Sequence, residues 1–176
     1  DFSGEIRLGR AVVRVERDAD GVRIIDSQGD CEHFDHVVIA AHANQALAML
    51  AAPSQQERAL LGKFRYQRNH AVLHSDPAFM PRRQAAWACW NYIGGQHSDG
   101  ADASFTYWMN RLQVLPGSKQ FFVTLNPKQD VRPDALHHSE IYDHPLFDAA
   151  AIEAQGQLWQ LQGRQRTWFC GAYFGA

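Results

Sequence analysis

Histidine and cysteine side chains are the first candidates for chemistry in this chain, which contains nine histidines and three cysteines. A catalytic zinc helix carries two histidines four positions apart with a glutamate beside the first, and structural zinc sites use closely paired cysteines. Neither spacing occurs: the adjacent pair His137-His138 has no such neighbours, and Cys31, Cys89 and Cys170 lie far apart. We therefore expect no metal site, and we expect the histidines in loops or at the surface.

Covalent catalysis is not indicated by the motifs either. Cys170 precedes Gly171 at a position that we expect to be buried, with no obvious basic partner to form a reactive thiolate. The sequence contains no Gly-x-Ser-x-Gly nucleophile motif and no phosphate-binding glycine loop. We leave the catalytic residues unassigned, and hydrolase chemistry has no supporting motif.

Aromatic and amide side chains form a third group, which is suited to an apolar pocket. The group comprises Trp87, Trp90, Asn91, Tyr92, Tyr107, Trp108 and Asn110. On alternate positions of two expected strands, Trp90 and Tyr92 share a face, as do Trp108 and Asn110. These four are our candidate substrate-pocket residues. A hydrophobic core with tryptophans at its rim explains each single residue at least as well.

The elements before this group begin with an extended stretch at 6–8 and continue with strands at 11–17, 22–26 and 31–35, which turn signals separate. The three strands predict a small antiparallel meander. The continuously apolar run at 37–41 is typical of a strand buried on both faces of a parallel sheet.

A short helix at 45–50 follows this strand. The pattern Ser54-x-x-Glu57 predicts a capping box that starts a second helix, whose inner side is Leu60, Leu61 and Phe64. Further strands are expected at 66–74, 86–92, 104–109, 120–125 and 167–170, with a loop at 94–100. Asp148 is expected to cap a helix with the apolar stripe Ala151, Ala154, Leu158 and Leu161.

The amino-acid composition limits the classes of protein to which the chain could belong. An apolar fraction of 45% can build a sizeable core, and the net charge of -2 gives no electrostatic footprint for a nucleic-acid partner. No apolar run reaches the length of a transmembrane segment. Three scattered cysteines favour a reducing compartment, so we expect a cytoplasmic location. Strand-like sequence at both ends leads us to expect an internal fragment of a longer protein.

Three segments resemble the flavin amine oxidases and FAD-dependent desaturases. The first segment is similar to the one that the family uses at the adenine end of FAD, and it comprises Arg7-Leu8, Val12 and the run from Val15 to Val22. The strand at 37–41 resembles the one that passes the cofactor, and Trp168-Phe169-Cys170-Gly171-Ala172 resembles the family's Phe-Ala-Gly-Glu ending. The order of the aromatic segments between them is similar to a bacterial NAD/FAD-binding branch of these proteins.

The resemblance implies a set of cofactor-binding residues, namely Val12, Ala40, Ala41, Gly171 and Ala172. Ala172 stands where the family often has an acidic residue, which puts a polar contact there in doubt. The chain lacks the Gly-x-Gly-x-x-Gly motif that would grip the FAD pyrophosphate. We therefore expect FAD in the parent protein, and weak or absent FAD binding by this chain alone.

The resemblance also implies an α+β (mixed α/β) fold, in which an antiparallel substrate-binding sheet with helices accompanies partial strands of a doubly wound FAD-binding domain. Residues 1–45 would be the partial FAD-binding region, 46–165 the substrate-binding domain, and 166–176 the start of a returning FAD-binding strand. The implied reaction is hydride transfer to flavin from a small apolar or amine substrate. The alternative is a non-catalytic mixed-sheet module that binds an apolar ligand or a partner protein.

Overall fold

A computed structural model describes residues 3–93 and 104–175 and divides the chain into two compact units. The first unit comprises residues 1–66 and 145–176, and the second comprises residues 67–144. The loop expected at 94–100 lies outside the described residues. Helices and antiparallel sheets occur together, as the predicted mixed fold requires.

The first unit opens with the predicted meander, whose strands are β1 (Val12–Arg17), β2 (Val22–Asp26) and β3 (Cys31–Phe34). The Asp18 carboxylate accepts hydrogen bonds from the backbone N–H groups of Asp20 and Gly21, which closes the first turn. The stretch at 6–8, which we expected to be extended, forms no strand among the described residues, and a turn begins at Leu8.

A parallel pair of strands, β4 (Val37–Ile39) and β10 (Thr167–Phe169), joins segments far apart in the chain. Ile39 and Phe169 are buried, but Val38 is 64% exposed. The expectation of burial on both faces is therefore wrong for β4, since only one face of this pair is covered. Cys170, which follows β10, is exposed rather than buried as expected.

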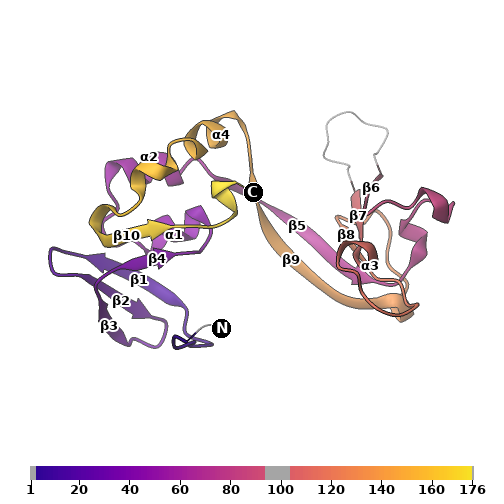
Figure 1. Cartoon of the computed structure of the whole chain (residues 1–176), viewed down its shortest axis with the longest axis horizontal. Coiled ribbons are helices and arrows are strands. Elements are labelled where there is room, and N and C mark those ends of the chain that lie inside the picture. Colours follow the sequence, from indigo (N-terminus) through magenta and orange to yellow (C-terminus); the bar gives the residue numbers. More distant parts are fainter. Residues whose placement is uncertain (1–2, 94–103, 176) are drawn as a thin grey trace. The chain divides into compact units, whose positions relative to one another are not determined.

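Helices cover one side of this pair, with α2 and α4 opposite the meander in Figure 1. The helices are α1 (Ala43–Met49), α2 (Gln55–Leu61) and α4 (Ala149–Gln155). The predicted capping box is confirmed: Ser54 Oγ accepts from the Glu57 N–H at 3.1 Å, and a Glu57 carboxylate oxygen accepts from the Ser54 N–H at 2.6 Å.

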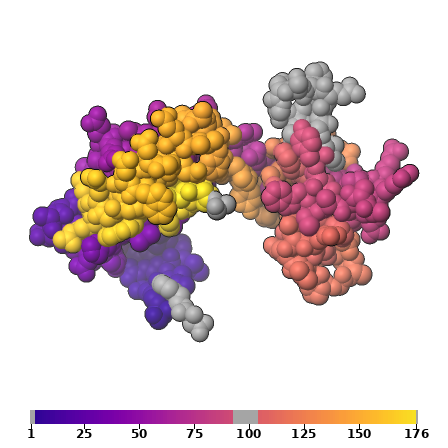
Figure 2. Space-filling view, turned by 45° about the horizontal axis from the view of Figure 1, so that its top comes forward, coloured from indigo at the N-terminus to yellow at the C-terminus, as the bar shows by residue number. Residues whose placement is uncertain are grey.

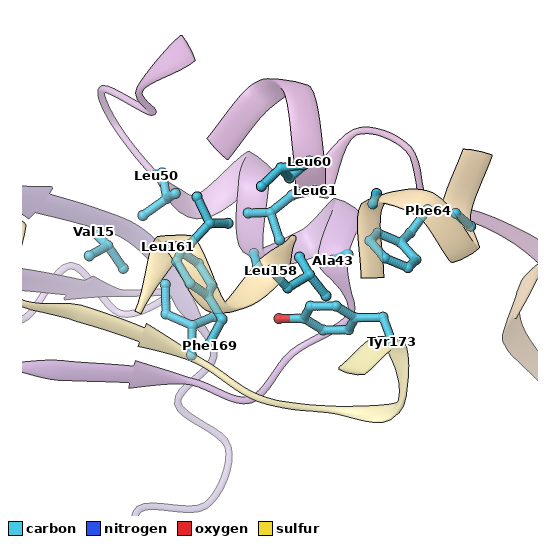
Figure 3. Packing of buried hydrophobic residues seen from close by; sticks show 14 of the residues in the cluster. Val15, Ala43, Leu50, Leu60, Leu61, Phe64, Leu158, Leu161, Phe169 and Tyr173 are labelled. Carbon is cyan, nitrogen blue, oxygen red and sulfur yellow. The ribbon is translucent and has the colours of Figure 1, made fainter. Parts of the chain in front are cut away.

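The predicted apolar stripe on the last helix is buried, although the helix is shorter than expected. Asp148 caps it as predicted by accepting from the Ala151 N–H. The α-helical part ends at Gln155, and the chain continues as a 3-10 turn, Leu158–Leu161. Figure 3 shows Leu158 and Leu161 of this stripe packed in the core of the first unit. The fully buried members of that core include Val15, Leu61, Leu158, Leu161, Phe169 and Tyr173.

The second unit is built on a five-stranded sheet with the order β6-β7-β8-β5-β9. Its strands are β5 (Arg65–His74), β6 (Trp90–Ile93), β7 (Ser104–Trp108), β8 (Phe122–Leu125) and β9 (Leu136–Leu146). Short helical turns connect them: α3 (Met109–Leu112) and the 3-10 turns Pro77–Phe79, Gln84–Ala86 and Pro133–Ala135.

The structure of this unit differs from the local sequence expectations at two places. The strand expected from residue 86 begins at Trp90, because 84–86 form a 3-10 turn. His137 and His138 lie at the surface, one of the two places expected for them, but they belong to the long strand β9 and not to a loop. Most of β9 is exposed and rich in histidine and acidic residues, so it lacks the apolar alternation by which a half-buried strand is recognised.

A buried polar chain crosses the sheet of the second unit. His74 Nε2 donates to Thr124 Oγ1 at 2.8 Å, and Thr124 exchanges a hydrogen bond with Thr106 at 2.9 Å. His74 Nδ1 accepts from the Asp76 N–H, which fixes this tautomer. Burial lowers the pKa of His74, although the nearby Asp76 carboxylate opposes the shift. The histidine is therefore a neutral, fully bonded core residue.

Candidate functional site

The candidate cofactor residues of the first unit meet in an apolar cleft of about 690 Å³. Val12 lies at the start of β1, and Ala40 and Ala41 follow the carboxyl end of β4. The structure brings these three residues to one cleft, although 28 positions separate Val12 from Ala40. The complete lining is Ala11, Val12, Val13, Val15, Ile24, Val37, Val38, Ile39, Ala40, Ala41, Gln45, Ala48 and Met49.

The chemistry of this lining favours a flat, uncharged group. Among the described residues that line the cleft, none carries a charge, and Gln45 has the only side-chain amide. Val13 and Val38 expose apolar surface at the cleft, which a bound apolar group would cover. The alanines keep side-chain bulk low, so a ring could approach the backbone closely. These residues fit the adenine end of a dinucleotide, and those that the structure describes bring no charged side chain for its pyrophosphate.

Gly171 lies beside this cleft, where the chain leaves β10. Its φ of 139° is rarely adopted by residues with a side chain. A Cβ atom at Gly171 would stand 3.1 Å from the Tyr173 ring and 3.7 Å from the Ala41 carbonyl oxygen. The predicted cofactor positions Gly171 and Ala41 are therefore near one another. Ala172 opens the 3-10 turn Ala172–Phe174 and does not line the cleft.

A buried ion pair that the sequence analysis missed ties β1, α2 and β10 of the first unit together. Arg17 at the end of β1 donates to both carboxylate oxygens of Glu57, at 2.5 and 3.0 Å, and both side chains are almost completely buried. Arg17 also donates to the Ala52 carbonyl and to Thr167 on β10. Burial alone would raise the pKa of Glu57, but hydrogen bonds from Arg17 and Ser54 lower it below its usual range.

A second missed feature lies at the start of α1, directly after Ala41. The His42 ring stacks on Tyr66 with 4.5 Å between the ring centroids. The Tyr66 hydroxyl accepts the Ala43 N–H at 2.7 Å, and burial raises the pKa of Tyr66. This pair fixes the turn between β4 and α1. The only sequence signal was the polar His42-Ala43-Asn44 step after a buried strand, since the tyrosine comes from a distant segment.

The four candidate substrate-pocket residues of the second unit do not form one wall. Trp90 and Tyr92 share a face of β6, as expected, and their side chains are 70% and 61% exposed. They pack across the strands against Tyr107 and Phe105, with ring centroids 5.8 and 5.1 Å apart. The exposed Trp90, Tyr92 and Phe105, together with the half-buried Tyr107, form the aromatic face of the sheet.

Trp108 and Asn110 lie elsewhere. Trp108 alternates with Tyr107 on β7, so it belongs to the opposite face, where its ring packs edge-on against Trp87. Asn110 is in α3 rather than on a strand. Its side-chain amide donates to the Lys119 carbonyl and accepts from the Phe121 N–H. The NH2 group and the oxygen of its side-chain amide therefore both bind the protein's own backbone.

Neither a cluster of metal-binding side chains nor a helix of membrane-spanning character occurs among the described residues. No group of three or more histidine, cysteine, aspartate or glutamate side chains within 3–93 and 104–175 is placed to hold a metal ion. Over the same residues, no helix has the length and apolar character needed to cross a bilayer.

Comparison with known proteins identifies the family. The family model of the flavin-containing amine oxidoreductases matches residues 3–97, which is more than half of the chain. The chain belongs to this family. The match covers β1 to β6 and thus includes the cleft at Val12, Ala40 and Ala41. No curated protein matches the sequence.

Solved structures share the fold at low sequence identity. A CLA-producing fatty acid isomerase from P. acnes aligns with a TM-score of 0.56 and 12% identity, over 92% of this chain and 42% of that chain. A reduced UDP-galactopyranose mutase aligns with a TM-score of 0.60 and 12% identity, over 97% of this chain and 42% of that chain. The chain thus spans less than half the length of either structure.

Proposed function

We propose that this chain forms the adenine-side edge of an FAD site together with the substrate-binding sheet of an FAD-dependent oxidoreductase. The observation that carries the proposal is the uncharged cleft at which Val12, Ala40 and Ala41 converge. Membership of a flavin-containing amine oxidoreductase family supports flavin as the cofactor. FAD, rather than a shorter flavin, is favoured because the cleft suits an adenine ring.

The chain's residues would bind and orient the cofactor. Val12 and Ala40 would contact the two faces or the edge of the adenine through apolar atoms and backbone, while Gly171 would leave room beside Ala41. When bound, the flavin supplies hydride acceptance from a C–N or C–C unit of the substrate. The pyrophosphate would require N–H donors from outside this cleft, which is why we expect the chain alone to bind FAD weakly or not at all.

The aromatic face of the second unit would receive the substrate. Trp90 and Tyr92 expose large apolar surfaces, which would exclude water from a bound apolar or amine group. Within this proposal, residues 1–45 and 166–176 serve the cofactor and 46–165 serve the substrate. The compact units divide the chain at 66/67 and 144/145 instead, because the helices α1, α2 and α4 pack with the meander.

The second candidate function is a non-catalytic module, and the aromatic face favours it equally well. An exposed row of aromatic side chains on the edge strand β6 can bind a partner protein as readily as a small ligand. The two functions differ in the first unit, since only the flavoenzyme needs the cleft at Ala40.

A cleft-filling variant tests the proposal. Ala40→Trp places an indole where the adenine would lie, whereas Ala59→Trp makes the same change on the exposed surface of α2, away from the cleft. The protein, expressed with its native flanking sequence, would be reconstituted with FAD and its bound flavin measured. We expect Ala40→Trp to lose FAD and Ala59→Trp to retain it. Equal flavin in both variants would refute the placement of the adenine.

A further inference from the structure

A solvent-exposed apolar loop follows α3 in the second unit, and neither the cofactor nor the substrate proposal uses it. Residues 111–119, the Val114 loop, have the sequence Arg-Leu-Gln-Val-Leu-Pro-Gly-Ser-Lys. Val114 is 86% exposed and Leu112 is 40% exposed. Single exposed apolar residues are ordinary, but here two stand together with Leu115 and Pro116 at one tip. In Figure 2 the coral atoms of this region gather on the surface of the second unit.

The tip is also conformationally strained. Val114 has a φ of 51°, in the left-handed region that a β-branched residue rarely adopts. Such a conformation costs on the order of 1 kcal/mol or more, and asparagine or glycine would adopt it more easily. Neither local backbone preference nor core packing explains a valine at this position, since its side chain is exposed. A use for the side chain in binding would explain it.

The base of the Val114 loop is fastened to the sheet. The Asn110 amide donates to the Lys119 carbonyl at 2.8 Å and accepts from the Phe121 N–H at 2.7 Å. Beneath it, the Trp108 indole donates to the Gln120 side chain at 2.7 Å. These bonds hold the two ends of the loop together, so Val114 is presented to solvent from a fixed base.

The charge carried by the loop itself is positive, although the chain as a whole carries a net charge of -2. Arg111 and Lys119 stand at the two ends of the loop, and both are exposed. The sequence from 104 to 126 contains no aspartate or glutamate. An apolar tip between cations matches a surface that is apolar inside and anionic outside, which is the profile of a bilayer with acidic headgroups.

An apolar hollow of about 440 Å³ lies directly beside the tip. Gln113 and Leu115 of the loop form part of its wall, next to Met109 and Phe121. Among the described residues that line it, His138 is the only one with a titratable group that could carry a positive charge. A hollow of this kind can accept acyl-chain segments, whereas a protein partner would gain little from an unfilled cavity at its contact.

We infer that the Val114 loop is a lipid-docking site that inserts its tip into the interface of an anionic bilayer, with Arg111 and Lys119 bound to the headgroups. Val114 and Leu112 would enter the boundary of the acyl chains. The docking is peripheral, in keeping with the absence of a bilayer-spanning helix from the described residues. It does not depend on flavin binding, so it stands or falls separately from the proposed function.

Vesicle co-sedimentation of the 176-residue chain tests this inference. Vesicles of phosphatidylcholine mixed with phosphatidylserine should bind the protein, and pure phosphatidylcholine should bind it more weakly. Val114→Asn removes the apolar tip while relieving the backbone strain, so the fold should survive; we expect binding to fall about tenfold. The paired change Arg111→Gln and Lys119→Gln should weaken binding to the anionic vesicles by about fivefold per residue.

The matched control is Ile152→Asn, which removes another exposed apolar side chain, 58% exposed, from α4 of the first unit. It should bind the anionic vesicles like the unaltered chain. The inference is overturned if the unaltered chain sediments with neither vesicle, which would leave a protein partner as the use of the loop. It is also overturned if Val114→Asn binds as well as Ile152→Asn while circular dichroism shows both to be folded.

Discussion

The buried ion pair between Arg17 and Glu57 makes a specific prediction about what stabilises the first unit. Arg17→Met keeps most of the side-chain volume but leaves the Glu57 carboxylate without its cation. Both side chains are 4% exposed or less, and the two are joined by two hydrogen bonds. Removing one partner of such a pair costs about 3–5 kcal/mol, because the other charge remains buried without compensation.

A second substitution separates charge burial from lost packing. Glu57→Gln in the Arg17→Met background removes the charge but keeps an oxygen that can accept from the Ser54 N–H. Only unsatisfied hydrogen bonds then remain, which cost about 1–3 kcal/mol, so the double variant should regain about 2 kcal/mol. The control is Arg65→Met, which breaks the Arg65–Asp148 pair at exposures of 69% and 36% and should cost less than about 1 kcal/mol.

The pair also predicts a dependence on pH. In the unaltered protein the folded pKa of Glu57 lies below its usual value of 4.5. Its stabilising contribution is therefore present above that pH and is lost as the pH falls through the folded pKa. In Arg17→Met, burial without the cation should raise the pKa of Glu57. The loss of folding stability in Arg17→Met, relative to the unaltered protein, should then be largest near neutral pH and become smaller at acidic pH.

Hydrogen exchange of peptides from β1 and α2, measured by mass spectrometry across a urea series, reads the stability of the first unit separately from the second. Far-UV circular dichroism confirms that each variant starts folded. The reasoning is refuted if Arg17→Met and Arg65→Met lose the same stability at neutral pH. It is refuted equally if Glu57→Gln fails to recover stability in the Arg17→Met background.

Three further predictions concern single side chains. The Tyr173 hydroxyl is buried in the core without a hydrogen-bond partner among the described residues, and burial raises its pKa. Tyr173→Phe removes this unsatisfied group and should therefore stabilise the first unit by about 1 kcal/mol, measured by urea unfolding. His74 has a lowered pKa, so stability of the second unit should decline as the pH falls below 6.5; His74→Gln, which can still donate to Thr124, should abolish that decline in a pH series of thermal melts. Ser54→Ala should cost about 1 kcal/mol in the exchange of α2 amides, because the Glu57 N–H loses its cap.

Much of the local structure could be predicted from the sequence, since local signals decide it. The meander follows from turn residues such as Asp18 and Gly21, and the start of α2 follows from Ser54 and Glu57. The apolar stripe ending at Leu161 was also predictable. Its residues are spaced so that they are buried on one side, and this holds although the last part is a 3-10 turn and not an α-helix. These features depend on residues within a few positions of one another.

Features that depend on distant partners were not predictable. Nothing near Arg17 in the sequence indicates Glu57, which is 40 positions away. Asn110 was assigned to a pocket because it follows an aromatic strand, but its amide binds the backbone of a returning segment instead. Strand β9 was not predicted because most of its residues are exposed, so it lacks the apolar alternation of a half-buried strand. Its pairing with β5 depends on the tertiary fold and not on local sequence.

The convergence of Val12, Ala40 and Ala41 was predicted from the family resemblance, and the structure places all three at one cleft. Whether that cleft holds FAD is most directly decided by an absorbance spectrum. The protein, expressed with its native flanking sequence and reconstituted with FAD, would be freed of unbound cofactor by gel filtration. We predict a stoichiometric oxidised-flavin spectrum that an amine or apolar substrate bleaches under anaerobic conditions. A folded protein that elutes without flavin would contradict the account.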